Sequence, residues 1–145
     1  MLRSVTRRRT LADWRVLAAA ASAQLLLAAA VRVTRLRNVR SLVARARPVV
    51  APWLGASEER TVWAIGAVGR RLPRVSTCLV RALAADLLLS ERGHPRHLVV
   101  GVRRSPAGAL EAHAWLERDG RALVGGEHAG EYVEFARLPA RTNQT

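Results

Sequence analysis

The hydrophobic period of the chain changes near residue 95, and this change constrains the fold more than any other feature of the sequence. Up to that point apolar residues recur every three or four positions, which is typical of amphipathic helices. Beyond it, β-branched runs and apolar–polar alternation indicate strands. Helices followed by strands predict an α+β fold, in which N-terminal helices precede a core with a small antiparallel sheet.

Four helices are expected before the change of period, of which the second is either separate or a continuation of the first after a bend. Thr10 opens a capping box at the start of the first, and the second ends before a linker at residues 48–55 that begins with a proline and ends with a glycine. Ser76 or Thr77 caps the fourth helix. The expected helices cover residues 11–31, 32–47, 58–71 and 78–92, with Gly93 as the C-terminal cap of the last.

Four strands are expected after the change of period. The dipeptide Asp119-Gly120 favours a two-residue hairpin between two of them. The segment 132–138 is interpreted as one more strand or as an irregular edge. The expected strands cover residues 97–102, 112–117, 121–124 and 132–138.

Length and charge bound the class of protein. The chain has 145 residues, half of them apolar, which suffices for one core. Its formal net charge is +13, and all its basic side chains are arginines. Residues 1–50 carry 11 of them and one acid, so we divide the chain into a basic, Arg-rich helical segment (1–50) and a core (51–145). Such a charge attracts an acidic partner; nucleic acid is not expected, because Trp14 alone offers an aromatic platform in the basic segment.

The apolar run Val16–Val31 raises the question of a membrane. It is about 16 residues long, short of the roughly 20 that span a bilayer, and it is mostly alanine. We interpret it as a buried or partner-facing helix; a membrane-associated helix is the alternative. The chain has a single cysteine, which is compatible with a reducing compartment, and we expect a cytoplasmic protein.

Cys78 and His113 are the candidate catalytic pair. Cys78 opens the fourth expected helix, where partial positive charge favours the thiolate. His113 lies in an alternating segment and can hold or take the proton. Trp115, two residues on, shares its strand face and can shield the pair from water. The alternative for each is structural: a small buried hydrophobe for Cys78 and a packed strand histidine for His113.

Three carboxylates are candidates for a third residue that orients the imidazole: Glu117, Asp119 and Glu127. Glu117 lies about 13 Å along the strand from His113, which is too far, and Asp119 is better explained by the hairpin turn. Glu127 follows the returning strand, so antiparallel geometry brings it near His113, and it is the favoured candidate. Ligands at metal spacing are missing, and neither a metal nor a cofactor is expected.

These motifs together resemble a known family. CLVRAL at 78–83, LVVGV at 98–102 and EAHAWLE at 111–117, with Gly93 and Gly120, resemble the leader peptidases of lasso-peptide biosynthesis, transglutaminase-like proteins of the microcin-processing type. The resemblance covers about residues 57–138. It matches the short, split form of the family, in which the leader-recognition domain is a separate protein.

The resemblance implies a papain- or transglutaminase-like core with a Cys-His-Asp triad. Cys78 corresponds to the nucleophile and His113 to the base; the family's Asp has no clean counterpart, and either Glu127 replaces it or the third member is dispensable. The implied activity is a cysteine peptidase that removes the leader from a ribosomally made precursor peptide. Its implied partners are the precursor, a leader-recognition protein and a lasso cyclase. Two other functions stay open: a non-catalytic adaptor that binds a peptide, and a membrane-associated helical protein.

Overall fold

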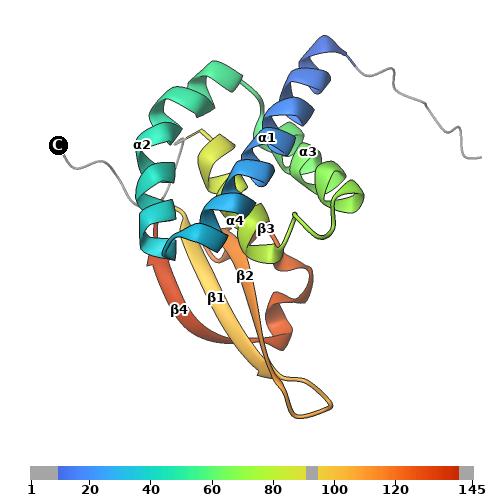
Figure 1. Ribbon diagram of the computed structural model, residues 1–145, viewed down its shortest axis with the longest axis vertical. Helices are drawn as coiled ribbons and strands as arrows, with labels where there is room; N and C mark the ends of the chain where they lie inside the picture. Colours follow the sequence, from blue (N-terminus) through green and yellow to red (C-terminus); the bar gives the residue numbers. More distant parts are fainter. Residues whose placement is uncertain (1–9, 91–94, 141–145) are drawn as a thin grey trace, which may run out of the picture.

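The computed structural model describes residues 10–90 and 95–140, and it confirms the α+β fold (Figure 1). Helix α4 lies between the other three helices and the sheet, because it packs on all of them and on strand β2 (Figure 1). The helices are α1 (Leu11–Val33), α2 (Leu36–Leu54), α3 (Glu58–Arg71), α4 (Cys78–Leu88) and the 3₁₀ helix η1 (Gly126–Glu131). The antiparallel strands are β1 (His97–Arg104), β2 (Leu110–Arg118), β3 (Arg121–Val124) and β4 (Val133–Pro139), in the order β3-β2-β1-β4.

The predicted starts of α1, α3 and α4 are confirmed at the level of single hydrogen bonds, whereas α2 starts at Leu36, four residues later than expected. Thr10 and Asp13 form the reciprocal capping box of α1, with the Thr10 amide donating to the Asp13 carboxylate at 2.8 Å. The Ser57 hydroxyl accepts the amide of Arg60 at 3.2 Å and caps α3. Thr77, rather than Ser76, caps α4. Such caps depend only on neighbouring residues, which is why the sequence shows them.

The predicted end of the second helix is wrong. Helix α2 continues through Pro48 and Pro52 to Leu54, so no linker starts at Pro48. The two prolines are exposed and four residues apart, so both missing amide donors lie on the solvent side of the helix. On the opposite side Arg47, Ala51 and Leu54 are buried, and this packing holds the helix together across the interruptions.

The predicted end of the fourth helix is also wrong. Helix α4 ends at Leu88, four residues early, and Leu89 turns to extended backbone. Leu89 is itself buried, so the chain leaves the helix to place this side chain in the core. The expected cap, Gly93, lies outside the described residues.

One hydrophobic core connects the basic helices with the rest of the molecule. Ala20 of α1, Val39 of α2, Ile65 of α3 and Leu83 of α4 belong to the same cluster of buried residues as Leu116 of β2. The predicted division at residue 50 concerns the roles of the two parts, and it stays a prediction. The continuous core means that α1 and α2 cannot be removed without exposing the buried faces of α3 and α4.

Helix α1 is a buried helix with one apolar side left exposed. It is long and apolar enough to cross a membrane, a property that buried helices share, and 39% of its apolar window is buried. The Gln24 side chain is fully buried and donates to the Ile65 carbonyl at 3.2 Å. Leu25 and Leu26 on the other side are exposed. The expected burial is therefore confirmed for one face of α1 only.

The two faces of the sheet have different neighbours. Leu98, Ala114 and Leu116 belong to the core beneath α4. Because side chains alternate along a strand, His113 and Trp115 lie on the other face of β2. The predicted hairpin is confirmed, since Asp119 and Gly120 both have positive φ (52° and 73°) between β2 and β3. The last expected strand is confirmed as β4, at the edge beside β1.

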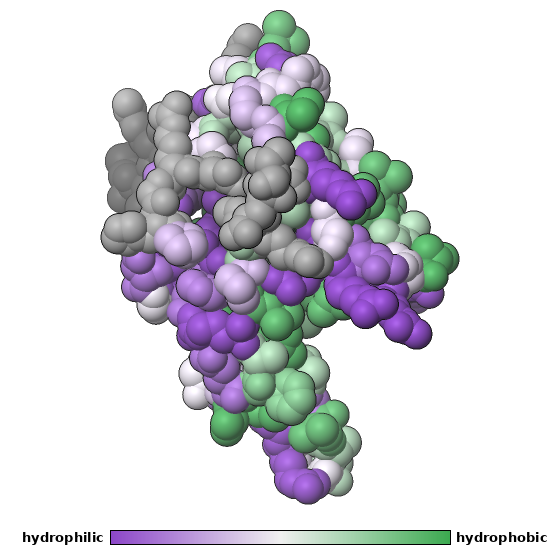
Figure 2. Space-filling view, turned by 90° about the vertical axis from the view of Figure 1, so that its left-hand side faces the viewer, coloured by the Kyte–Doolittle hydropathy of each residue, from purple (hydrophilic) through white to green (hydrophobic). Residues whose placement is uncertain are grey.

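The surface on the side of α2 and β4 is mixed in character. Figure 2 shows hydrophilic and hydrophobic residues interspersed over this face. On α2, Leu42, Val49 and Trp53 are exposed. Phe135 of β4 is exposed as well.

Candidate active site

Cys78 is the first residue of α4 and is half-buried against the core. The Thr77 hydroxyl accepts the amide of Val80 at 3.3 Å, and the Thr77 carbonyl accepts that of Arg81 at 2.9 Å. These bonds use the third and fourth amides of the helix. The amides of Cys78 and Leu79 therefore have no acceptor within α4, as expected at a helix start. They can stabilise a thiolate, or an oxyanion that forms beside it.

His113 lies on β2 opposite Gly101 of β1, between two aromatic rings. Its ring stacks on Trp115 at 5.9 Å between centroids, which confirms that the two side chains share a strand face. The ring of Tyr132 lies 5.1 Å away on a tilt. A Cβ on Gly101 would lie 2.7 Å from that of Tyr132, so the glycine makes room for the tyrosine beside the imidazole. The rings of Trp115 and Tyr132 hold His113 in a fixed, largely apolar setting.

Cys78 and His113 lie at the same level along β2. Leu89, just past the end of α4, and Arg118, at the end of β2, line one cavity, so helix and strand run in the same direction. The 11 residues of α4 span about 16 Å. Five strand residues back from Arg118 span about 17 Å and end at His113. The start of α4 is therefore at about the same height along the sheet as His113, whose side chain lies on the face of β2 opposite the core beneath α4.

The segment after β3 contacts both sides of the candidate site. Strand β3 is the edge strand beside β2, and beyond its last residue the backbone carbonyl of Gly125 lies 2.6 Å from His113 Nε2. Two residues on, the Glu127 carboxylate lies 3.7 Å from the Arg81 guanidinium. Arg81 is one turn along α4 from Cys78. The segment thus passes around the sheet edge and connects the imidazole with the first turn of α4. Among the described residues no hydrogen bond joins Cys78 directly with His113.

The three candidate carboxylates have other neighbours. Glu127 is 64% exposed at its side chain and pairs with Arg81. Asp119 is a turn residue of the hairpin. The Glu117 carboxylate accepts hydrogen bonds from Arg137 at 2.7 Å and from the Trp115 indole at 3.2 Å. The bond from Arg137, followed by that from Trp115, holds the pKa of Glu117 below its ordinary value, although burial opposes this shift.

Sequence reasoning missed Gly125, Arg81 and Tyr132. Gly125 acts through its backbone carbonyl, a group that every residue has, so its residue type does not indicate this role. The only sequence signal for it is a glycine directly after a strand. Arg81 is expected from helix periodicity to point away from the core, and its contact with Glu127 depends on the path of the chain after β3. Tyr132 reaches His113 because β4 pairs with β1, a partner that local patterns do not identify.

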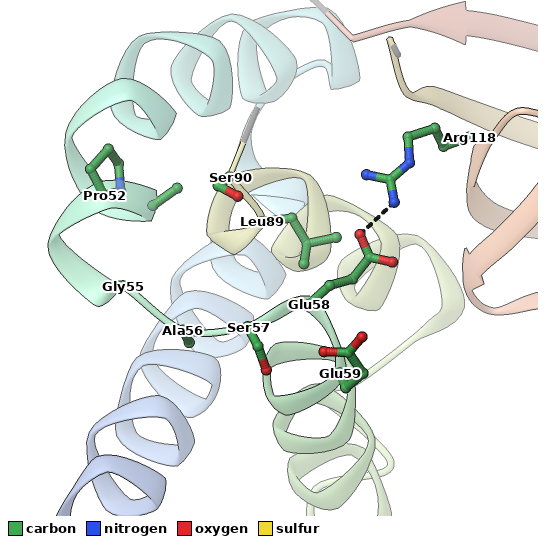
Figure 3. A pocket seen from close by; sticks show the side chains of 10 residues that line it. Pro52, Gly55, Ala56, Ser57, Glu58, Glu59, Leu89, Ser90 and Arg118 are labelled. Atoms are coloured by element: carbon green, nitrogen blue, oxygen red, sulfur yellow. Dashed lines mark hydrogen bonds and ion pairs between the residues drawn. The ribbon is translucent and has the colours of Figure 1, made fainter. Parts of the chain in front are cut away.

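A cavity of about 570 Å³ lies at the opposite end of α4 (Figure 3). Its lining includes Glu58 at the start of α3, whose carboxylate binds Arg118 at 2.6 Å, and Leu89 with Ser90 after α4 (Figure 3). Neither Cys78 nor His113 lines it. The cavity is therefore separate from the candidate active site.

Comparison with known families identifies the class of protein. A family model described as the transglutaminase-like superfamily matches residues 23–139, which run from the second half of α1 to the end of β4 and include Cys78 and His113. The chain belongs to this superfamily, which includes cysteine peptidases and transglutaminases. No curated protein and no solved structure matches the chain significantly.

Proposed function

We propose that this chain is a cytoplasmic cysteine peptidase that removes the leader from a ribosomally made lasso-peptide precursor. The observation that carries the proposal is the placement of Cys78 at the start of α4, level with His113 on β2, within a transglutaminase-like chain. The substrate class is supported by the resemblance of the segments around Cys78 and His113 to leader peptidases.

The chemistry follows from the two side chains. The Cys78 thiol loses its proton to His113, and the sulfur forms a bond to the scissile carbonyl carbon. The carbonyl oxygen takes the negative charge, which the open amides at the start of α4 stabilise. The C–N bond then breaks as His113 returns the proton to the amine of the core peptide. Water hydrolyses the remaining thioester and releases the leader. No cofactor enters these steps.

The helical half supplies a docking surface in this proposal. A groove of about 430 Å³ between α1 and α3 is lined mainly by apolar side chains, with Trp14 and Leu72 exposed at its margin. Trp53 of α2 is also exposed, and the Arg15 guanidinium lies 5.2 Å from its ring centre. Exposed tryptophans beside arginines are typical of binding surfaces. We propose that the leader or the leader-recognition protein docks here, before a lasso cyclase closes the ring.

The docking surface is tested with point variants, because deletion of α1 and α2 would expose the core. Trp14→Ala and Trp53→Ala should weaken binding of the leader-recognition protein without changing the far-UV circular dichroism. Phe135→Ala is the matched control, since Phe135 is an exposed aromatic residue on β4 and lines neither the groove nor the ring contact of Arg15. If both tryptophan variants bind the leader-recognition protein as tightly as wild type does, the proposed docking surface is wrong. That result would not contradict the proposed peptidase activity.

The activity is tested by cleavage of the precursor encoded beside this gene, with the leader-recognition protein added. Wild type should release the leader, whereas Cys78→Ala and His113→Ala should not. Mass spectrometry of the products identifies the cleavage position. Equal release by wild type and Cys78→Ala would exclude Cys78 as the nucleophile.

A non-catalytic adaptor is the second candidate. It is favoured by the lack of a direct hydrogen bond between Cys78 and His113 among the described residues. An adaptor needs no reactive thiol, so binding of the precursor without cleavage, together with an unreactive Cys78, would support it. A membrane-associated protein is the third candidate, because α1 exposes Leu25 and Leu26; sedimentation of the purified protein with phospholipid vesicles would support that function.

A further inference from the structure

The contact between His113 and Gly125 determines where the imidazole carries its proton. The carbonyl oxygen lies 2.6 Å from Nε2, which is hydrogen-bond distance. A carbonyl oxygen can only accept, so Nε2 must carry the hydrogen. In the neutral ring the lone pair is then on Nδ1. Among the described residues no hydrogen bond reaches Nδ1, which leaves it available to a substrate or to a thiol.

The position of the Gly125 carbonyl is fixed by the backbone around it. Gly125 is buried and has a φ of 83°, a conformation that side-chain-bearing residues rarely adopt. A Cβ there would lie 3.0 Å from the Ala114 carbonyl oxygen and 3.2 Å from the Trp115 Cβ. The residue thus packs directly on β2, the strand that carries His113. The carbonyl and the imidazole are therefore held relative to each other by the same strand.

Side-chain carboxylates are engaged elsewhere. Glu127 is nearest to His113 in the chain after β3, but its carboxylate pairs with Arg81 on the α4 side of the sheet edge. Glu117 lies on the same strand face as His113, but Arg137 and the Trp115 indole bind it. The Gly125 carbonyl accepts a hydrogen bond from one ring nitrogen and leaves the other free, which is the role that the orienting carboxylate has in a catalytic triad, although there the carboxylate binds Nδ1.

We propose that the backbone carbonyl of Gly125, and not a carboxylate, orients His113 and fixes its Nε2–H tautomer, so that Nδ1 is the basic atom of the ring. This inference rests on the proposed peptidase activity. In the proposed reaction Nδ1 is the atom that takes the proton given up by the thiol, and the resulting imidazolium keeps its Nε2–H bond to the Gly125 carbonyl oxygen. The same proton moves from Nδ1 to the leaving amine as the C–N bond breaks. Gly125 is a positioning residue, since it acts only through the ring.

The first test measures the tautomer of His113 and does not depend on peptidase activity. Nitrogen-15 chemical shifts of the imidazole of His113, assigned by comparison with His113→Ala, distinguish the two neutral tautomers. At a pH where the ring is neutral, the Nε2–H form is expected. The Nδ1–H form would overturn the inference, whether or not the protein cleaves a precursor.

The second test uses the proposed activity. Gly125→Ala should lower kcat by about a hundredfold, because the displaced carbonyl no longer holds the ring. Gly108→Ala is the matched control: Gly108 also has a positive φ (86°), but no atom lies within 4 Å of a Cβ built there. If Gly125→Ala does not fold, the kcat of Glu127→Gln distinguishes orientation by the carbonyl from orientation by a carboxylate. It should keep most of the wild-type kcat, whereas an orienting carboxylate predicts a loss of about 10⁴-fold. If wild type itself does not cleave, the proposed function fails and the tautomer measurement still tests the inference.

Discussion

Replacement of Asp86 by alanine should destabilise the protein more than any other loss of an acid side chain described above. Asp86 is a residue of α4 and is 9% exposed. Its carboxylate contacts Arg47 of α2 at 3.5 Å and Arg96, just before β1, at 3.4 Å. The Arg47 and Arg96 side chains are 2% and 4% exposed. Asp86→Ala therefore leaves two buried positive charges without their common counter-charge.

The magnitude follows from burial. Removal of one partner from a buried ion pair costs about 3–5 kcal/mol. The contacts of Asp86 are longer than ideal hydrogen bonds, and Arg96 keeps its bond to the Ser90 carbonyl at 2.8 Å, so we expect the lower limit, about 3 kcal/mol. Domains of this kind have about 5–15 kcal/mol of stability in total. The variant should thus lose a large part of it.

A matched control separates burial from distance. Glu134 binds Arg137 at 2.8 Å, a shorter contact than those of Asp86, but its side chain is 44% exposed. Glu134→Ala should cost at most about 1 kcal/mol. Urea unfolding followed by tryptophan fluorescence measures both variants. A cost below about 1 kcal/mol for Asp86→Ala would refute the reasoning that burial makes this cluster important.

Three further predictions concern the sheet and the start of α4. Glu117→Gln should lower the free energy of unfolding by about 2 kcal/mol at neutral pH. Because the folded state lowers the pKa of Glu117, its contribution is present above the unfolded pKa and disappears as the pH falls through the folded pKa, so wild type and variant should converge in acid. Gly101→Ala should cost about 1–3 kcal/mol, because its Cβ would lie 2.7 Å from a neighbouring Cβ, whereas Gly130→Ala meets no atom within 4 Å and should cost less. Thr77→Ala should lower the free energy of unfolding by about 1 kcal/mol, measured by thermal unfolding, and should slow the alkylation of Cys78. Thr10→Ala removes the cap of α1, which is distant from Cys78. It should lower the free energy of unfolding by as much and leave the alkylation rate of Cys78 unchanged.

The parts of the fold that depend on near neighbours could be predicted from the sequence. The caps at Thr10 and Ser57 and the hairpin at Asp119-Gly120 each involve residues within three positions of one another. The path of α2 through Pro48 and Pro52 could not be predicted, because burial of the opposite helix face against α4 overrides the local preference of proline.

The candidate site divides in the same way. The position of Cys78 at a helix start and the shared face of His113 and Trp115 follow from local period, and both are confirmed. The neighbours of Glu127 and Gly125 depend on how the chain passes the sheet edge after β3. The local hydrophobic period of the sequence gives no information about that path. A backbone carbonyl also has no residue type of its own, so a search among side chains could not find it.

The central claim is that Cys78 is an activated nucleophile, and its alkylation rate tests this most directly. The chain has one cysteine, so the reaction with iodoacetamide reports on a single sulfur. At mildly acidic pH an ordinary thiol is protonated and reacts slowly, and the half-buried position of Cys78 by itself slows the folded protein further. The account predicts that the folded protein nevertheless reacts faster than the urea-unfolded one, and that His113→Ala removes the difference. A folded protein that reacts no faster than the unfolded chain would contradict the account.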